Sequence, residues 1–245
     1  MRTRKFIVVL VAVLMVGALL PAGAFAAFYN SQGTSADAWW SSWDWNNGEP
    51  GPSDAVIDWS VSGWTGGGIF KDAGVPMDRT KSTMAMASMS SYTPAVGDEP
   101  QAWAEFFCFA EPPDVLTFGR NLATAKLDFL AEGTLNIWRG TEPWIQTGPD
   151  EWTMRDPDET STEMVSVVAS WKATGPLTRS AYFSKERSAE SWYMDRSQQT
   201  YRRASADASV VGASGTVYFD QSMFSVMDAQ ISSSKGHGRF SGVMY

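Results

Sequence analysis

The sequence predicts an all-β protein, an antiparallel β-sandwich with a jelly-roll or a barrel as the alternative, that follows an N-terminal signal peptide. Three observations predict this class. Apolar and polar residues alternate strictly in several segments, turn-forming residues separate those segments, and no segment of ordinary helix length after the signal has the apolar period of a helix. A period of two is that of a strand with one buried face and one solvated face.

The beginning of the chain, residues 1–26, has the three parts of a secretory signal. A basic stretch is followed by an unbroken apolar run over residues 6–20 and by a small-x-small cleavage site that ends at Ala26. The alternative is a retained membrane anchor, because the uncharged stretch reaches about the 20 residues that a spanning helix needs, although Pro21 and Gly23 disfavour that helix. We therefore expect a secreted or cell-surface protein without a membrane-inserted segment after cleavage.

The next part of the chain, residues 27–68, is predicted to be an irregular segment rich in Trp, Gly and Pro, because alternation is weak there. Half of the twelve tryptophans lie in it, namely Trp39, Trp40, Trp43, Trp45, Trp59 and Trp64. The remainder, residues 69–245, is predicted to be one antiparallel β domain.

Within this β domain, alternation predicts which side chains face the core. The residues predicted to face it, besides further members between Ala204 and Val210, are Leu127, Phe129, Ala131, Val165, Val167, Ala169, Trp171, Ala181, Phe183, Val217 and Phe219. Turns are predicted where glycine recurs, at Glu132-Gly133, Arg139-Gly140, Thr174–Pro176, Gly212–Gly215 and Lys235–Gly238. An acidic stretch, residues 144–163, is expected to form loops.

The charge balance limits the classes of partner. Cleavage after Ala26 removes three of the 19 lysines and arginines, which leaves 16 against 27 acidic residues and a formal charge of −11. A strongly acidic chain argues against nucleic acid or an anionic membrane surface as the main partner. A glycan, a cell-surface protein or a second copy of the chain is the expected kind of partner.

Cys108 is the only cysteine, so no intramolecular disulfide can form. It lies in an alternating stretch, residues 102–110, that contains no cationic neighbour. We therefore predict a buried, unreactive thiol that packs as a small hydrophobic side chain.

The sequence offers few residues for metal binding. His237 is the only histidine and lies between glycines in a predicted turn, so a zinc site is not expected. Asp44 and Asp156 begin acidic stretches that lack the glycine and the closing glutamate of a helix-loop-helix calcium loop. No cofactor and no metal are expected, with a loose calcium site of loop carboxylates and carbonyls left open.

Catalysis is not expected either, although a glycoside hydrolase needs only two carboxylates. Glu105 is the candidate, because it lies in an apolar strand beside Phe106 and Phe107, where burial would favour the protonated acid. The sequence places no partner carboxylate beside it.

The tryptophan cluster is the feature that points most directly to binding. Exposed indole rings can stack on sugar rings while neighbouring polar groups bond the hydroxyls, which is the mixture expected of a ligand site. The predicted ligand-binding residues are Trp39, Trp40, Trp43, Asp44, Trp45 and Asn46. The competing interpretation is that these large apolar side chains close the core.

These observations predict a secreted or cell-surface β domain that is non-catalytic and acts by binding or by assembly. Pairing along an exposed strand edge is one way in which such a domain assembles. The alternatives are a Trp-rich carbohydrate-binding module and a two-carboxylate glycoside hydrolase.

Overall fold

The structure is a computed structural model that describes residues 24–71, 77–149, 151–187 and 191–243. All but the last three residues of the predicted signal peptide lie outside the described residues. None of the helical turns in the described part of the chain is long and apolar enough to cross a membrane.

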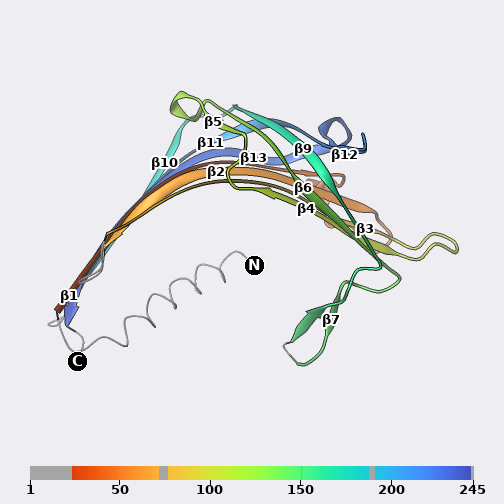
Figure 1. The fold of residues 1–245 in the computed structure, drawn as a ribbon, viewed down its shortest axis with the longest axis horizontal. Coiled ribbons are helices and arrows are strands. Elements are labelled where there is room, and N and C mark those ends of the chain that lie inside the picture. The colour runs from red at the N-terminus through yellow and green to blue at the C-terminus, as the bar shows by residue number, and fades with distance from the viewer. Residues whose placement is uncertain (1–23, 72–76, 150, 188–190, 244–245) are drawn as a thin grey trace.

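The predicted all-β antiparallel class is confirmed, because nearly all regular structure consists of antiparallel strands (Figure 1). The strands of the large sheet are β1 (Ala24–Ser41), β2 (Val56–Lys71), β3 (Asp78–Thr93), β4 (Ala102–Ala110), β5 (Val115–Phe118), β6 (Thr124–Arg139), β9 (Glu159–Ala173), β10 (Thr178–Arg187), β11 (Ser191–Gly212), β12 (Val217–Asp220) and β13 (Ser225–Val243). A separate hairpin consists of β7 (Trp144–Gln146) and β8 (Trp152–Met154). Three short 3-10 turns, η1 (Trp45–Asn47), η2 (Arg120–Leu122) and η3 (Gln221–Met223), complete the described elements.

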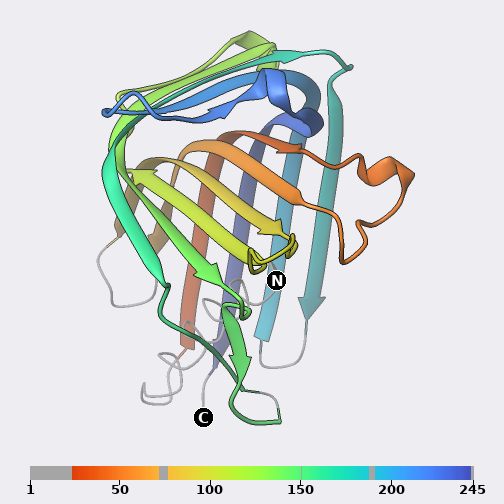
Figure 2. The same ribbon diagram turned by 90° about the vertical axis from the view of Figure 1, so that its right-hand side faces the viewer.

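Part of the large sheet closes on itself. Each strand of the closed ring is hydrogen-bonded to the next in the order β11, β13, β1, β2, β3, β4, β6, β9 and back to β11. Figure 2 shows β6 and β9 as a roof above β1 to β4, with the core between these two layers. The ring thus combines the facing layers of a sandwich with the continuous pairing of a barrel.

The long strands continue beyond the ring as a curved, single-layered sheet (Figure 1). The opening occurs in β11, which pairs with β9 over residues 204–212 and with β10 over residues 192–201. We call this extension the open sheet. It consists of β10 with the parts of its neighbours that lie beyond the ring: residues 191–202 of β11, 232–243 of β13, 24–35 of β1, 64–71 of β2 and 78–84 of β3. Its outer strands are β10 on one side and residues 78–84 on the other.

The core of the ring is built from aromatic side chains facing small ones. Phe219 of the short strand β12 lies between two tryptophans, with ring centroids 5.1 Å from Trp40 and 5.2 Å from Trp59. The small residues on the same inner surface are Ala36, Ala38, Ala85, Ala87, Ala206 and Ala208. Each large ring therefore has room because the strands around it carry alanine.

Most predicted core residues are confirmed, but three are not, namely Ala181, Phe183 and Val217, which are exposed. The inner positions of β6 and β9, from Leu127 and Phe129 to Trp171, are buried. Phe183 is 60% exposed and Val217 is 60% exposed. Phe183 alternates as expected, but its strand lies in the open sheet, where no second layer covers it.

The prediction of an irregular segment over residues 27–68 is corrected by the structure. Residues 24–41 and 56–71 are strands of the large sheet, and only the connection between them is irregular. The alternation was hard to see because the inward residues of β1, such as Ala36 and Ala38, are small, while the half-buried Trp39 faces outward. Hydropathy therefore contrasts weakly between the two faces.

The predicted turns at Glu132-Gly133 and Lys235–Gly238 are also corrected, because these residues lie within β6 and β13. The ring of Tyr29 in β1 crosses β13 at Gly238, and its hydroxyl donates a 2.6 Å hydrogen bond to Asp195 of β11. A Cβ at Gly238 would overlap this ring. The glycine is required for this close approach and not for a change of chain direction. Burial and the bond to Asp195 raise the pKa of Tyr29 well above its usual value.

We expect Gly238→Ala to destabilise the protein by about 1–3 kcal/mol, because the added methyl group displaces the Tyr29 ring. Thermal unfolding measures this loss. In a Tyr29→Ala background, Gly238→Ala should cost little more, since the obstructing ring is absent. Equal losses in both backgrounds would contradict this explanation of the glycine.

Glu163 of β9 anchors the turn between β11 and β12. It accepts hydrogen bonds from the Tyr218 hydroxyl at 2.5 Å, from the Ser214 amide at 2.9 Å and from the Ser214 hydroxyl at 3.1 Å. These bonds, with that from Tyr218 foremost, lower the pKa of Glu163. Burial and the bond to Glu163 raise the pKa of Tyr218 to about 12.

We expect Glu163→Gln to lower the melting temperature by a few degrees at neutral pH. A carboxylate with a lowered pKa in the folded state contributes stability above its unfolded pKa and loses it as the pH falls through the folded pKa. The difference from the wild type should therefore shrink in acid. Glu132→Gln, on the adjacent strand, is the control and should change neither the melting temperature nor its pH dependence. A difference in melting temperature between Glu163→Gln and the wild type that does not vary with pH would refute the mechanism.

Candidate functional site

The six tryptophans of the predicted binding cluster divide between the core and the surface. Trp40 is 0% exposed and Trp59 is 1% exposed. Trp39, Trp43 and Trp45 are half-buried at the end of β1 and in the following connection. Trp40 is therefore a correction to the predicted ligand-binding set: it continues the inward alternation of Ala36 and Ala38 and lies opposite the buried Trp59, where a ligand cannot reach it.

The remaining members of the set bond mainly to one another. Asp44 caps η1 by accepting hydrogen bonds from the Asn46 backbone amide and side chain, at 3.1 and 3.2 Å, and from the Asn47 side chain at 2.5 Å. The ring centroids of Trp39 and Trp45 are 6.3 Å apart, and the Trp45 indole donates a 2.9 Å hydrogen bond to Ser41. The structure thus gives Asp44 and Asn46 a role in shaping this loop, and their use in ligand binding stays a prediction.

Glu105, the candidate acid, is half-buried on the outer side of β4. It lines a hollow of 190 Å³ together with Trp103, Glu142 and Trp144. Sequence reasoning could not find Glu142 as a neighbour, because the connection after β6 carries it there. A hydrolytic role for Glu105 stays a prediction.

Cys108 is 1% exposed, and burial raises the pKa of its thiol to about 11. The predicted buried cysteine is confirmed. At neutral pH such a group is a thiol and not a thiolate, so it is a poor nucleophile.

The arrangement that sequence reasoning missed lies on the convex side of the open sheet. Directly paired residues on neighbouring antiparallel strands point to the same face of a sheet, so the strand register defines rows of side chains across the strands. The outermost full row is Lys185–Met194–Arg239–Phe28–Lys71, followed by the row Phe183–Arg196–His237–Asn30–Ile69–Arg79. The next rows are Ala181–Gln198–Lys235–Gln32–Gly67–Lys81 and Arg179–Thr200–Ser233–Thr34–Thr65–Thr83.

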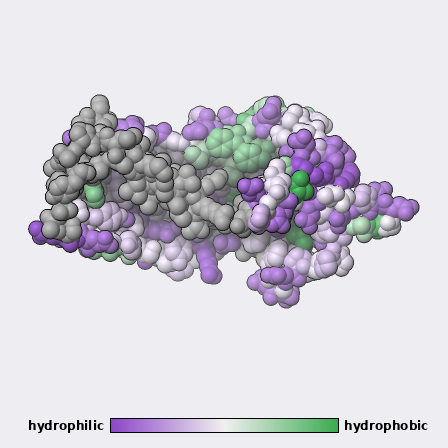
Figure 3. Space-filling view, turned by 90° about the horizontal axis from the view of Figure 1, so that it is seen from below, coloured by the Kyte–Doolittle hydropathy of each residue, from purple (hydrophilic) through white to green (hydrophobic). Residues whose placement is uncertain are grey.

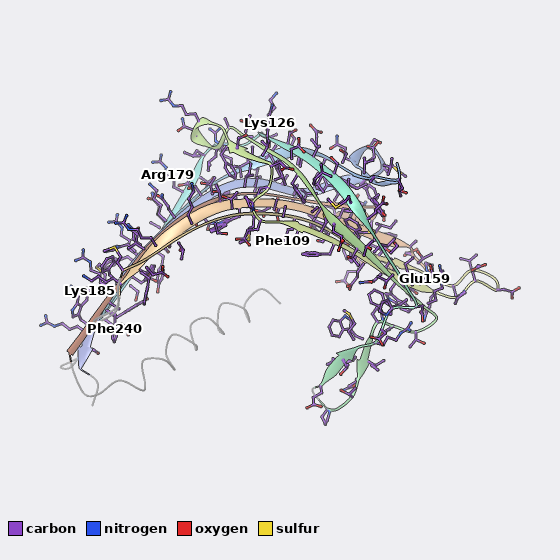
Figure 4. All side chains as sticks on the ribbon, in the orientation of Figure 1. Phe109, Lys126, Glu159, Arg179, Lys185 and Phe240 are labelled. Atoms are coloured by element: carbon purple, nitrogen blue, oxygen red, sulfur yellow. The ribbon has the colours of Figure 1, made fainter. Side chains whose placement is uncertain are left out.

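These rows, with Arg187 opposite Trp192, place nine exposed cations on one face. We call this surface the cationic face and define it by Lys71, Arg79, Lys81, Arg179, Lys185, Arg187, Arg196, Lys235 and Arg239. They are nine of the sixteen lysines and arginines that follow residue 26. Figure 4 shows Arg179 and Lys185 on the convex side of the arch, opposite the side that carries Phe109.

Carboxylates are kept off this face. The described carboxylates of the open sheet, Asp78, Glu186 and Asp195, pair with Phe70, Tyr193 and Gly238 in the alternate rows and therefore lie on the concave side. Neither Arg139–Glu159 nor Arg155–Asp158, the ion pairs of the described residues, involves a member of the cationic face. Within the described part of the chain, no cation of this face is therefore neutralised by a carboxylate in an ion pair.

The centre of the cationic face is hollowed. A groove of 580 Å³ runs over the glycines of β2 and is lined by Arg79, Lys81 and Lys235 together with neutral side chains such as Asn30 and Gln32. Gly67 contributes no side chain to its row, which leaves the floor low between Gln32 and Lys81. Charged and neutral hydrogen-bond donors therefore line the same groove.

His237 belongs to this face and not to an exposed turn. It lies half-buried between Asn30 and Arg196, and its Nε2 accepts a 3.2 Å hydrogen bond from the Arg239 side chain. His237 therefore orients the Arg239 side chain on this face.

The opposite side of the arch has a different character. Phe107 is 50% exposed and Phe109 is 42% exposed on the outer side of β4. Figure 3, which views the molecule from below, shows hydrophobic residues gathered over part of this side. The convex and concave sides therefore offer chemically distinct surfaces.

A sequence signal for the cationic face existed. Cations recur every second residue in Arg79-Thr-Lys81, Lys185-Glu-Arg187 and Lys235-Gly-His-Gly-Arg239, which is the period of a strand with one cationic face. Alternation between apolar and polar residues does not reveal this cationic period. The net negative charge also concealed a local positive surface.

Comparisons with known proteins add no assignment. No family model matches the chain, and no curated protein matches it. The cryo-EM structure of the T2SS secretin XcpQ from Pseudomonas aeruginosa aligns with 8% identity over 98% of this chain and 62% of that chain, at a TM-score of 0.11. A likeness at that level carries no argument about fold or function.

Proposed function

We propose that this protein is an exported, non-catalytic binding protein whose cationic face holds an acidic polysaccharide. The observation that supports the proposal is the segregation of nine exposed cations on one hollowed face of an otherwise acidic chain, with none of the described carboxylates of the open sheet on that face. Like charges gathered on one surface repel one another, and a bound polyanion relieves that repulsion.

The spacing of the cations favours a polymer with charges set apart along it. Neutral residues separate the cations within each row, so that Arg239 and Lys71 lie two strands apart, at about 10 Å. Amides and hydroxyls such as Gln32, Thr200 and Ser233 fill the positions between cations and can bond sugar hydroxyls.

An acidic polysaccharide suits this protein better than a nucleic acid does. The chain after residue 26 has a formal charge of −11, and only three of its described carboxylates, Asp78, Glu186 and Asp195, lie in the open sheet. A duplex that extended past the open sheet would be repelled by the ring, since its charges are dense and its axis is stiff. A flexible chain with one charge per sugar can be confined to the cationic face.

In the proposed function, the protein binds the polysaccharide and does not cleave it. A glycoside hydrolase needs two carboxylates facing the bond that it cleaves. The described carboxylates of the open sheet lie on the side away from the cationic face. We therefore expect a ligand to be released unchanged.

Binding of polygalacturonate to the protein that begins at Ala27 tests the proposal. We expect the triple variant Arg79→Gln/Lys81→Gln/Lys235→Gln to weaken binding roughly tenfold, because each exposed ion pair contributes about 0.2–1 kcal/mol. Titration calorimetry at low salt measures the dissociation constant. Binding should also weaken as salt is raised, since exposed charges are screened.

The matched control removes the same number of charges from the ring, as Arg120→Gln/Lys126→Gln/Lys172→Gln, and should bind like the wild type. Neutral dextran should not bind, and no new reducing ends should appear. Stronger binding of duplex DNA than of polygalacturonate would refute the choice of ligand. Loss of binding in Trp43→Ala but not in the triple variant would move the site to the tryptophan segment.

A further inference from the structure

The strand β10 is a ten-residue edge strand that lacks two of the features that prevent edge-to-edge pairing, a proline and a β-bulge. It pairs with β11 in an unbroken register and has no other strand partner within the described residues. It contains no proline, and all of its side chains except Ser184 are exposed. Tyr182 is 58% exposed on one face and Phe183 is 60% exposed on the other. Such an edge is a template for a further strand.

The sequence of β10 is complementary to itself in one antiparallel register. We propose that two copies of this chain pair through β10, antiparallel, about a two-fold axis that passes through Ser184. In this register Phe183 of each copy lies opposite Lys185 of the other, which permits two cation–π contacts across the edge. Tyr182 lies opposite Glu186, which allows a hydroxyl–carboxylate hydrogen bond, and no two like charges are directly opposed.

The neighbouring symmetric registers are disfavoured by charge. An axis through Phe183 places Arg179 opposite Arg187, and an axis through Tyr182 places Arg179 opposite Lys185. Like charges that face one another directly across a strand pair are destabilising. Among two-fold axes through residues 182–186, the positions of the four charged residues thus favour the axis at Ser184.

The second free edge of the open sheet, residues 78–84 of β3, offers a different assembly. Pairing of β10 with that edge in another copy joins two different surfaces, so the resulting pair keeps one free edge of each kind. A contact of this type continues into an open polymer unless its rotation closes a ring. The β10 pair is isologous and stops at two copies.

A pair formed in this way joins the two cationic faces. A two-fold axis perpendicular to the sheet keeps the same face of both copies on the same side, so the rows of cations continue across the edge. The pairing does not depend on the proposed polysaccharide, although a polyanion that spans both faces would hold two copies together. A single strand pair buries less than the roughly 1,200 Å² of a stable interface, so we expect a weak, concentration-dependent dimer.

A cysteine placed on the axis tests the proposal directly. In Ser184→Cys the two new thiols face each other, within the Cα separation of about 4.4–6.8 Å that a disulfide spans. Mild oxidation should give a covalent dimer on a non-reducing gel. The native Cys108 does not interfere, because it is buried.

Ser180→Cys is the matched control, since it introduces the same residue on the same face and strand. In the proposed register it does not face its own symmetry mate, so it should remain largely monomeric under the same oxidation. Equal cross-linking of both variants, or cross-linking of Tyr182→Cys instead of Ser184→Cys, would overturn the register.

Sedimentation velocity of the unmodified protein gives an independent measure. The weight-average mass should rise from monomer toward dimer with concentration and should stop there. Phe183→Lys should keep the protein monomeric, because it opposes lysine to Lys185 in both halves of the pair, and Phe183→Lys/Lys185→Glu should restore the dimer. A strictly monomeric wild type at high micromolar concentration, or a mass that grows beyond two copies, would reject the proposal.

Discussion

The architecture depends on one exchange of hydrogen-bonding partners. Along one edge, β11 pairs with β10 at its beginning and with β9 at its end, while its other edge pairs with β13 over residues 191–203. Where β9 is the partner, the strands close into a ring with two facing layers. Where β10 is the partner, the sheet stays open and a single layer remains. Since every backbone amide and carbonyl buried in a sheet must be paired, this exchange decides where a core can exist.

The inner face of the sheet changes from apolar to charged where β11 changes its partner from β9 to β10. Ile231 of β13 lies opposite Arg202 and Ala36 at the mouth of the ring, and the rows further inside are apolar. The rows beyond it carry Lys235, His237 and Arg239 in the same alternate positions of the same strand. The cationic face is therefore a continuation of the surface that lines the core. The side chains become charged where the second layer ends, because only there can they remain hydrated.

Packing within the ring explains how a chain without a disulfide holds this shape. Phe219 fills the space between Trp40 and Trp59, and the alanines of β1, β3 and β11 leave room for these rings. Truncation of a buried aromatic side chain typically costs about 3–5 kcal/mol, so this cluster supplies much of the specificity that a cross-link would otherwise provide. The open sheet lacks such a core. Tyr29 contributes there by joining β1 to β11 across Gly238.

The sequence by itself determined the antiparallel class, the inner residues of β6 and β9 and the burial of Cys108, because alternation records which face of a strand is dry. Only the tertiary structure decided that Trp40 is buried while Trp39 faces outward, that Gly238 lies within a strand, and that cations from β2, β3, β10, β11 and β13 share one surface. The physical reason is that alternation assigns a residue to a face of its own strand. Which faces become neighbours depends on strand order and register, and these are set by pairings between residues far apart in the chain.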